Sequence, residues 1–216
     1  MSVIKINRFI AEESAAKTGV KQVLTNAPTW IIDPIDGTIN FVRKLDFVCI
    51  SIALAIDQDL KIAILYNPCL NEIYTAVKGA GAFRNGERIN ASKVTEIKNA
   101  LFAHEISLAS VSQFEVKYIE RARAFVSKSM GIRALGSAAL TLCYVARGTL
   151  DAYNIEDLKP WDIAAGALIV MEAGGTIIDK HGGPIDIMKP DIIATGTKEL
   201  ALIVQSLIKE IDDKFP

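Results

Sequence analysis

The feature that most limits the possible folds is the apolar stretch at residues 47–56, FVCISIALAI, which only Ser51 interrupts. A membrane-spanning helix needs about 20 apolar residues, so this stretch is too short to cross a bilayer. Its length and its valine and isoleucine content predict a strand, and its continuous apolarity predicts a strand buried on both faces. No other stretch is longer, so no membrane-spanning segment is expected.

Further short apolar runs surround this stretch, and turn signals separate them. Asn85-Gly86 lies between two of these runs and is a residue pair typical of a type I′ hairpin. Residues 1–100 are therefore predicted to form mainly an antiparallel meander. Strands are expected at residues 30–32, 47–56, 60–66, 72–77, 82–84 and 87–89.

Strands and helices alternate in residues 101–216. Ser137 is a favourable N-cap for one helix, and Asp162 is expected to open another. Such alternation predicts an α/β architecture in which helices cover the faces of sheets. Without a repeat or a linker-like tract, residues 1–216 are expected to form one domain. Helices are expected at 112–127, 137–146, 162–174 and 198–211, and strands at 100–104, 131–135, 150–155, 176–178 and 192–195.

Charge and cysteine content narrow the classes of function. The chain has 24 basic and 25 acidic side chains and a net charge of −1, which argues against a broad basic surface for nucleic acid or anionic lipid. Three scattered cysteines and two histidines argue against a disulfide framework and a zinc site. The N-terminus lacks the pattern of a secretory signal, so a cytoplasmic location is expected.

The first acidic segment with chemical potential is DPIDGT at residues 33–38. Pro34 keeps Asp33 out of helical geometry, and Gly37 permits an unusual backbone and the close approach of a ligand. Asp33 and Asp36 can then point to the same side, beside the free N–H groups of a short helical turn. Carboxylates next to free amides suit hard cations together with a phosphate. The alternative is a plain turn with solvated aspartates.

Asp162 and the pair Glu12-Glu13 are the other acidic candidates. Taken alone, Asp162 is a helix N-cap worth about 1 kcal/mol, and the glutamates are a solvated helix start. If Glu12 and Asp162 converge with the two aspartates of DPIDGT, four carboxylates share one cleft. Like charges repel strongly in such a site, so it would require cations. Ligands that are all oxygen favour Mg²⁺ over zinc or copper.

Together, the three segments resemble the signatures of the inositol monophosphatase family, in the same order along the chain. WIIDPIDGTINF at 30–41 resembles the first signature, WDIAAG through EAGG at 161–175 the second, and FIAEES at 9–14 the upstream acidic motif. The TINF continuation is closer to inositol monophosphatases than to their nucleotidase and fructose-bisphosphatase relatives. The resemblance implies a layered α-β-α-β-α sandwich, a homodimer, and Mg²⁺-dependent, lithium-sensitive hydrolysis of inositol monophosphate.

The resemblance also implies roles for individual residues. Glu12, Asp33 and the Ile35 carbonyl would hold one Mg²⁺ ion, and Asp33, Asp36 and Asp162 a second. Glu12 and Thr38 would orient and deprotonate the attacking water. The phosphate would rest on the amides of Gly37 and Thr38. The implied substrate contacts are Asp36, Gly37, Thr38, Gly136, Ser137, Ala138, Glu156 and Asp162.

The sequence departs from the family pattern in two places. The acidic motif follows closely after Met1, where the family usually has a helix pair, so an uncovered sheet flank is expected. Ile155 stands where the family has a substrate-binding glutamate, and Glu156 follows it. Either Glu156 takes over that role or the substrate differs. Two alternatives stay open: a catalytically impaired short paralog acting as a dimerisation partner, and a phosphatase of another sugar or nucleotide phosphate.

Overall fold

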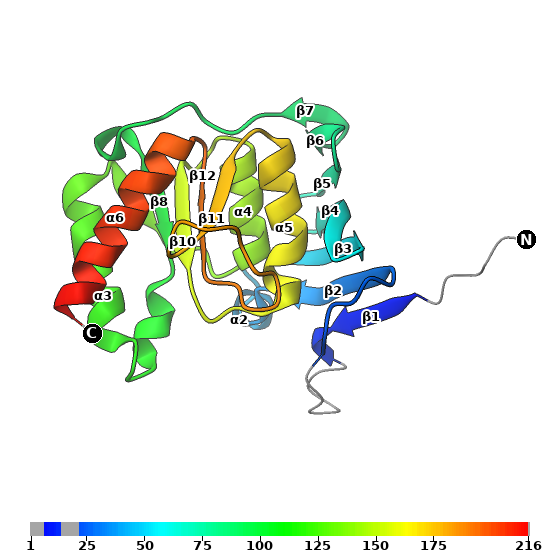
Figure 1. Ribbon diagram of the computed structural model, residues 1–216, viewed down its shortest axis with the longest axis horizontal. Helices are drawn as coiled ribbons and strands as arrows, with labels where there is room; N and C mark the ends of the chain where they lie inside the picture. The colour runs from blue at the N-terminus through cyan, green and yellow to red at the C-terminus, as the bar shows by residue number, and fades with distance from the viewer. Residues whose placement is uncertain (1–6, 14–21, 216) are drawn as a thin grey trace, which may run out of the picture.

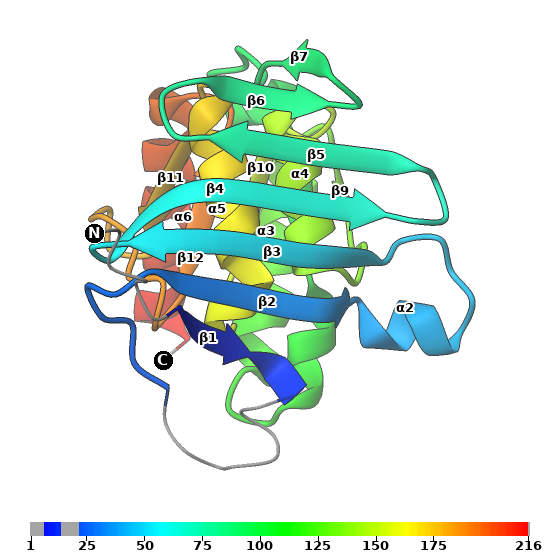
Figure 2. The ribbon, with the colours of Figure 1, turned by 90° about the vertical axis from the view of Figure 1, so that its right-hand side faces the viewer.

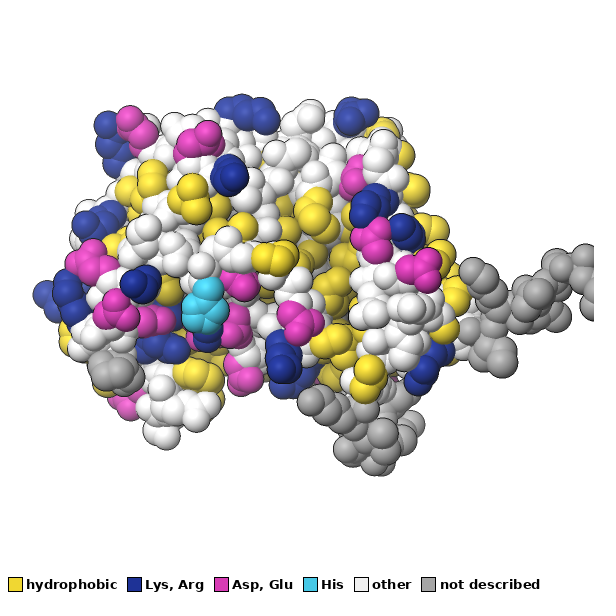
Figure 3. Space-filling model, in the orientation of Figure 1, with side chains coloured by type: hydrophobic (Ala, Val, Ile, Leu, Met, Phe, Trp, Pro, Cys, Tyr) yellow, Lys and Arg dark blue, Asp and Glu magenta, His cyan; other side chains and the backbone are white. Residues whose placement is uncertain are grey.

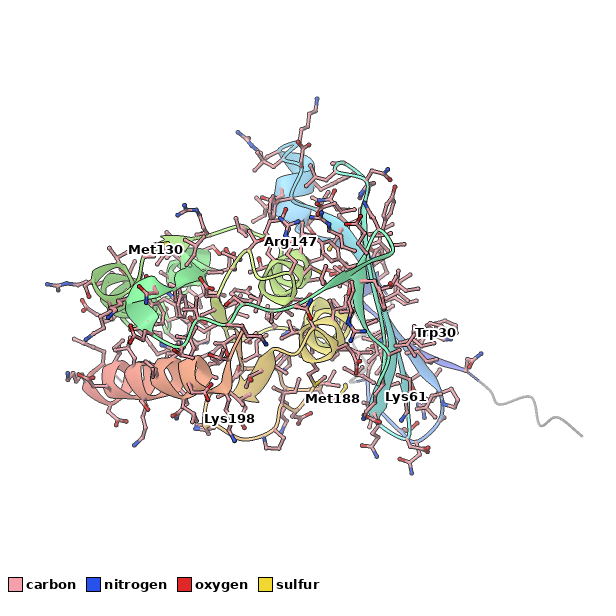
Figure 4. All side chains as sticks on the ribbon, turned by 90° about the horizontal axis from the view of Figure 1, so that it is seen from above. Trp30, Lys61, Met130, Arg147, Met188 and Lys198 are labelled. Carbon is pink, nitrogen blue, oxygen red and sulfur yellow. The ribbon has the colours of Figure 1, made fainter. Side chains whose placement is uncertain are left out.

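A computed structural model describes residues 7–13 and 22–215 (Figure 1). Two β-sheets alternate with two pairs of helices, one pair between the sheets and one beyond the smaller sheet (Figures 1 and 4). The described residues thus show four layers of the expected sandwich, β-α-β-α. The inner pair is α4 (Ala138–Ala146) and α5 (Pro160–Glu172), and the outer pair is α3 (Glu115–Lys128) and α6 (Lys198–Lys214).

The larger sheet has seven strands in chain order. All neighbours pair antiparallel except the first two, which pair parallel, so the predicted meander is confirmed. The first strand, directly before Glu12, was not expected. The strands are β1 (Arg8–Ala11), β2 (Thr29–Asp36), β3 (Cys49–Ile56), β4 (Asp59–Asn67), β5 (Glu72–Val77), β6 (Gly81–Arg84) and β7 (Glu87–Ile89).

The prediction that residues 47–56 are buried on both faces is wrong. Burial alternates along β3: Cys49 and Ala53 are buried against the inner helices, whereas Ile50 on the other face is 38% exposed. Figure 2 shows this outer face of the sheet, and none of the described helices covers it. Continuous apolarity was therefore not a sign of two-sided burial in this strand.

The smaller sheet has five strands in the order β11-β12-β10-β8-β9. Its strands pair parallel around β8 and antiparallel around β12. One apolar core lies between the two sheets around α4 and α5, and a second lies between the smaller sheet and the outer helices. The strands are β8 (Leu101–His104), β9 (Gly131–Arg133), β10 (Ala152–Ile155), β11 (Thr176–Asp179) and β12 (Ile192–Thr195).

The surface agrees with the near-neutral net charge. On the face drawn in Figure 3, acidic and basic side chains are interspersed. Cys49, Cys69 and Cys143 are free thiols, as expected from their spacing. Among the described residues, no helix has the length and apolarity needed to span a membrane.

Candidate active site

Three aspartates from distant parts of the chain meet at one point between the sheets. Asp33 and Asp36 lie at the end of β2, and Asp162 lies in the first turn of α5. One oxygen of each carboxylate lies within 4.8 Å of the others. Asp33 and Asp36 are 2% and 6% exposed. The structure therefore brings together the aspartates of the two strongest sequence segments.

The end of β2 is shaped by its own residues. Asp33 pairs with Ser51 and Asp36 with Cys49, so β2 has one extra residue between the two aspartates relative to β3. Such a bulge lets two residues three apart on a strand point to the same side. The Asp33 carboxylate accepts the Ile35 N–H at 2.9 Å, which fixes a local turn. At Gly37, φ is +87°, and a Cβ atom would lie 2.8 Å from the Phe47 carbonyl oxygen. Glycine is therefore required here for both conformation and space.

A short helix follows at once, α2 (Thr38–Val42), with Gly37 as its N-cap. The predicted helical turn after DPIDGT is thus confirmed. The Thr38 hydroxyl donates to the Ile35 carbonyl at 3.3 Å. The first N–H groups of a helix have no partner within the helix. Because α2 begins two residues after Asp36, its first amides are close to the carboxylates. An anion bound beside the carboxylates could accept hydrogen bonds from these amides.

The start of α4 holds Asp36 in place. The Ser137 hydroxyl and the Ala139 N–H, the latter at 3.1 Å, both donate to one Asp36 oxygen. The Ser137 hydroxyl also accepts the Leu140 N–H, so Ser137 is the N-cap of α4, as predicted.

The prediction that Asp162 opens its helix is wrong by three residues. Helix α5 begins at Pro160 after the N-cap Lys159. Proline needs no N–H partner at this first helical position. Asp162 lies in the first turn and accepts the Lys159 N–H at 2.7 Å. Its carboxylate therefore stabilises the helix start and still faces the other two aspartates.

Burial raises the pKa of each carboxyl in this cluster. The pKa of Asp33 rises to about 8, because burial and the charge of Asp36 disfavour ionisation. The pKa of Asp36 rises to about 7 and that of Asp162 to about 6, again mainly through burial. The charge of Glu12 contributes to the raised pKa of both Asp33 and Asp162. Glu12 is therefore near the cluster, although it is not one of the three carboxylates in closest contact.

The donor set fits a hard divalent cation. Among the described residues, no Lys or Arg forms an ion pair with any of the three aspartates. Buried carboxylates that repel one another need a positive charge from elsewhere to ionise together. Three oxygen donors suit Mg²⁺ or Ca²⁺. A metal-dependent site is thus the reading that the raised pKa values and the geometry share.

A cavity of about 230 Å³ adjoins the cluster. Five of the predicted contacts line it: Asp36, Gly136, Ser137, Ala138 and Asp162. Ile155, which the sequence analysis placed at the family's substrate-binding position, lines it as well. The sequence did not indicate the remaining lining residues, which are Glu105, Ser107, Leu108, Tyr153 and Leu158.

Glu105 and Tyr153 show why these residues were missed. The buried Glu105 carboxylate accepts the N–H groups of Leu135 and Gly136 at 2.8 and 3.0 Å, so it holds the loop before α4. A lone glutamate in a loop gives no such signal in the sequence. Tyr153 is fully buried, and its hydroxyl has no hydrogen-bond partner within the described structure.

Glu156 does not reach the cavity. Strand side chains alternate between faces, so Tyr153 and Ile155 point to the cavity and Glu156 points to α3. The Glu156 carboxylate lies 2.7 Å from Arg121 and 3.2 Å from Lys117. Although burial opposes it, the attraction of these cations lowers the pKa of Glu156. This placement argues against the predicted substrate contact by Glu156.

Comparisons with known proteins agree with this geometry. Inositol monophosphatase 2 of Rattus norvegicus is 42% identical over 207 residues, which are 95% of this chain and 71% of that protein. The structure of a Thermotoga maritima IMPase is 34% identical, with a TM-score of 0.81 over 97% of this chain and 76% of that one. Staphylococcus aureus IMPase-II, solved with inositol monophosphate and with 2′AMP, is 27% identical, with TM-scores of 0.83 and 0.84 over 96% of this chain and 78% of each.

The sequence pattern that describes the inositol monophosphatase family matches residues 3–212, which is nearly the full chain. The relatives and the solved structures carry the same family name, and their fold is a layered α/β sandwich like this one. Their names and the acidic cluster support a phosphatase function. From the family match and the identity to its relatives, the chain belongs to the inositol monophosphatase family.

Proposed function

We propose that this protein is a Mg²⁺-dependent phosphatase that hydrolyses inositol monophosphate to inositol and phosphate. The observation that carries the proposal is the convergence of Asp33, Asp36 and Asp162 within 4.8 Å beside a cavity. Uncatalysed hydrolysis of phosphate monoesters is among the slowest reactions that enzymes accelerate. A site for this reaction must therefore stabilise much negative charge, and a buried carboxylate cluster can do so only by holding cations.

The three aspartates would hold Mg²⁺, with the Ile35 carbonyl and Glu12 completing the predicted ligand set. Asp36 is already positioned by the start of α4, and Asp162 by the N–H of Lys159. Little reorganisation is then needed when a cation binds. Bound Mg²⁺ supplies positive charge that stabilises the reacting phosphate and the departing oxygen.

The chain's own groups would position the phosphate and the water. The amides of Gly37 and Thr38, at the start of α2, would donate to phosphate oxygens. Glu12 would accept the proton of the attacking water, and the interaction of its charge with Asp33 supports a position near the cluster. Thr38 would orient that water through its hydroxyl, which in this structure donates to the Ile35 carbonyl.

The test is phosphate release from inositol 1-phosphate by the purified chain. We expect turnover in millimolar Mg²⁺, none with a chelator, and recovery when Mg²⁺ is restored. Heat-inactivated protein provides the control for contaminating phosphate. If no phosphomonoester is hydrolysed under any of these metal conditions, the proposal is wrong.

A second candidate is the hydrolysis of another sugar or nucleotide phosphate. The observation that favours it is that Ile155, an apolar side chain, lines the cavity where Glu156 was expected to contribute. A similar fold, that of the Staphylococcus aureus protein, has been solved with 2′AMP. A panel of inositol, sugar and nucleoside monophosphates separates the two candidates by their kcat/KM values.

A homodimer, a cytoplasmic location and inhibition by lithium remain predictions from the family resemblance and the sequence. The alternative of an impaired paralog that acts as a dimerisation partner is tested by the same preparation. Sedimentation of the chain alone and mixed with a longer family member reports both assembly states. An inactive chain that forms a mixed species would favour the partner role.

A further inference from the structure

The cavity beside the aspartates is lined by two chemically different kinds of residue. The polar ones include Asp36, Asp162 and the start of α4, together with Glu105, Ser107 and Tyr153. Three large apolar side chains, Leu108, Ile155 and Leu158, form the apolar part of the lining, called its apolar side below. They come from separate segments: the turn after β8, the last residue of β10, and the loop that leads into α5. They have no group that could bind a cation or a phosphate, so they suit contact with the alcohol part of a phosphate ester.

Strand register fixes which residue contributes to this apolar side. In β10, Ile155 pairs with Ile192 on β12, and Ile155 is 4% exposed. A slip by one residue would turn every side chain of β10 to the opposite face. Asn154 would then leave its hydrogen bond to His104, which measures 3.0 Å. The packing of the sheet therefore keeps Ile155 in the cavity.

The ion pairs of Glu156, on the opposite face of the sheet, also keep Ile155 in the cavity and Glu156 out of it. Arg121 is fully buried, and its guanidinium contacts both Glu156 and Asp212. Lys180 lies 3.7 Å from the Glu156 carboxylate as a further cation. If Glu156 turned into the cavity, buried Arg121 would lose one of its two carboxylates. A buried charge without its partner is strongly unfavourable, so Glu156 stays away from the substrate.

We propose that Ile155, flanked by Leu108 and Leu158, determines specificity for the alcohol part of the substrate. The inference rests on the proposed phosphatase function and deepens it. A substrate hydroxyl pressed against these side chains loses its water without gaining a partner, whereas a C–H edge gains apolar contact. Among phosphate monoesters, inositol monophosphates included, the favoured ones are those that bind with C–H groups rather than hydroxyl groups against Leu108, Ile155 and Leu158.

Two esters with the same ring size test this class directly. Cyclohexyl phosphate has a six-membered carbon ring without free hydroxyls, and inositol 1-phosphate has the same ring with hydroxyls around it. The quantity to measure is the ratio of their kcat/KM values in Mg²⁺. A change of this ratio between variants cancels the intrinsic reactivity of the two esters, and it does not depend on how much of a variant folds.

The variants are Ile155→Gln, Ile155→Val and Glu156→Gln. We expect Ile155→Gln to shift the ratio at least about tenfold toward the inositol ester, because the glutamine amide can form a hydrogen bond with a substrate hydroxyl. Ile155→Val keeps the apolar side and should shift the ratio less than about threefold. Glu156→Gln changes a side chain on the opposite face of β10 and should leave the ratio within the same limit.

The outcomes separate this inference from the function on which it rests. Hydrolysis of either ester with a ratio that Ile155→Gln leaves unchanged would overturn the role of Ile155 alone. A shift with Glu156→Gln as large as that with Ile155→Gln would overturn it as well, because it would place Glu156 at the substrate. Absence of Mg²⁺-dependent hydrolysis of any phosphomonoester would overturn the proposed function, and the inference with it.

Discussion

Two groups of buried carboxylates lie in this molecule, and they behave in opposite ways. Asp33, Asp36 and Asp162 have raised pKa values. Glu156, which is 4% exposed and thus about as buried as Asp33 and Asp36, has a lowered pKa. The two groups lie on opposite sides of the smaller sheet. The aspartates, from β2 and α5, are on the cavity side, and Glu156, which follows β10, is on the side of α3.

The difference comes from the charge of the neighbours. Glu156 is surrounded by the cations of Arg121, Lys117 and Lys180, which offset the cost of its burial. The charged neighbours of Asp33, in contrast, are the acidic groups Asp36, Glu12 and Asp162, which raise its pKa. The comparison teaches that burial alone does not mark a functional carboxylate. A buried acidic group that the chain itself neutralises is structural, whereas a group left to repel is one that an external cation can complete.

The largest effect is expected from removing the central cation of the Glu156 network. Arg121→Met leaves Glu156 and Asp212 without their shared partner, and we expect a loss of about 3–5 kcal/mol in the free energy of unfolding. Urea unfolding measures it. Combining Arg121→Met with Glu156→Gln should restore part of this loss. Equal stability of Arg121→Met and the unchanged chain would contradict the described network.

The next effect concerns activity rather than stability. Asp36→Asn removes a predicted metal ligand, and Mg²⁺-dependent kcat/KM should fall at least about 100-fold, since even outer-shell partners of metal ligands contribute 10–100-fold. Asp191→Asn is the matched control, because Asp191 pairs with Lys180 at 2.8 Å outside the cavity. Similar activity in the two variants would show that Asp36 is not a ligand.

The two groups should also respond to pH in opposite directions. For the aspartates, the folded pKa values of about 6 to 8 lie above the ordinary value of 3.8. Their contribution to stability is therefore fully present below pH 3.8 and is lost as pH rises through 6 to 8. The pKa of Glu156 is lowered, so its contribution is present above 4.5 and is lost only in more acidic solution.

Between pH 5 and 8, the stability of the metal-free protein should thus fall, by roughly 1.4 kcal/mol per pH unit for each proton released. Unfolding experiments with a chelator at several pH values give this slope. Asp36→Asn should make it shallower, and Glu156→Gln should leave it unchanged. A stability that rises across this range would contradict the raised pKa values.

The smallest effect is stabilisation by the metal itself. At ten times its Kd, Mg²⁺ should increase the free energy of unfolding by about 1.4 kcal/mol, because it binds the folded state. Thermal unfolding with and without Mg²⁺ measures the shift. It should shrink in Asp36→Asn and persist in Glu156→Gln. An equal shift in both variants would place the cation elsewhere.

The sequence alone predicts the elements well and the site in part. The meander is predictable because its turn signals and apolar runs are local. The turn around Asp33, Pro34 and Gly37 is predictable for the same reason. The approach of Asp162 to this turn is not, since it depends on how α5 packs between two sheets. Only the resemblance to a known family predicted that convergence.

Other features escape because they depend on tertiary contacts. The assignment of Ile155 and Glu156 to opposite faces rests on a one-residue register that composition does not reveal. Arg121 gives no signal of its burial, because arginine on a helix is ordinarily exposed. The strand before Glu12 is short and becomes regular only through its pairing with β2. In each case a neighbour far along the chain determines the outcome.

The outer face of the seven-stranded sheet affects which method can follow thermal unfolding of this protein. Ile50 on β3 and Ile73 and Val77 on β5 are 38%, 40% and 52% exposed, and these strands flank β4 (Figure 2). Fluorescent dyes that report melting bind to such apolar surfaces. We therefore expect such a dye to bind the native protein and to fluoresce before the protein is heated. Circular dichroism, which follows the backbone, is the better probe for its transitions.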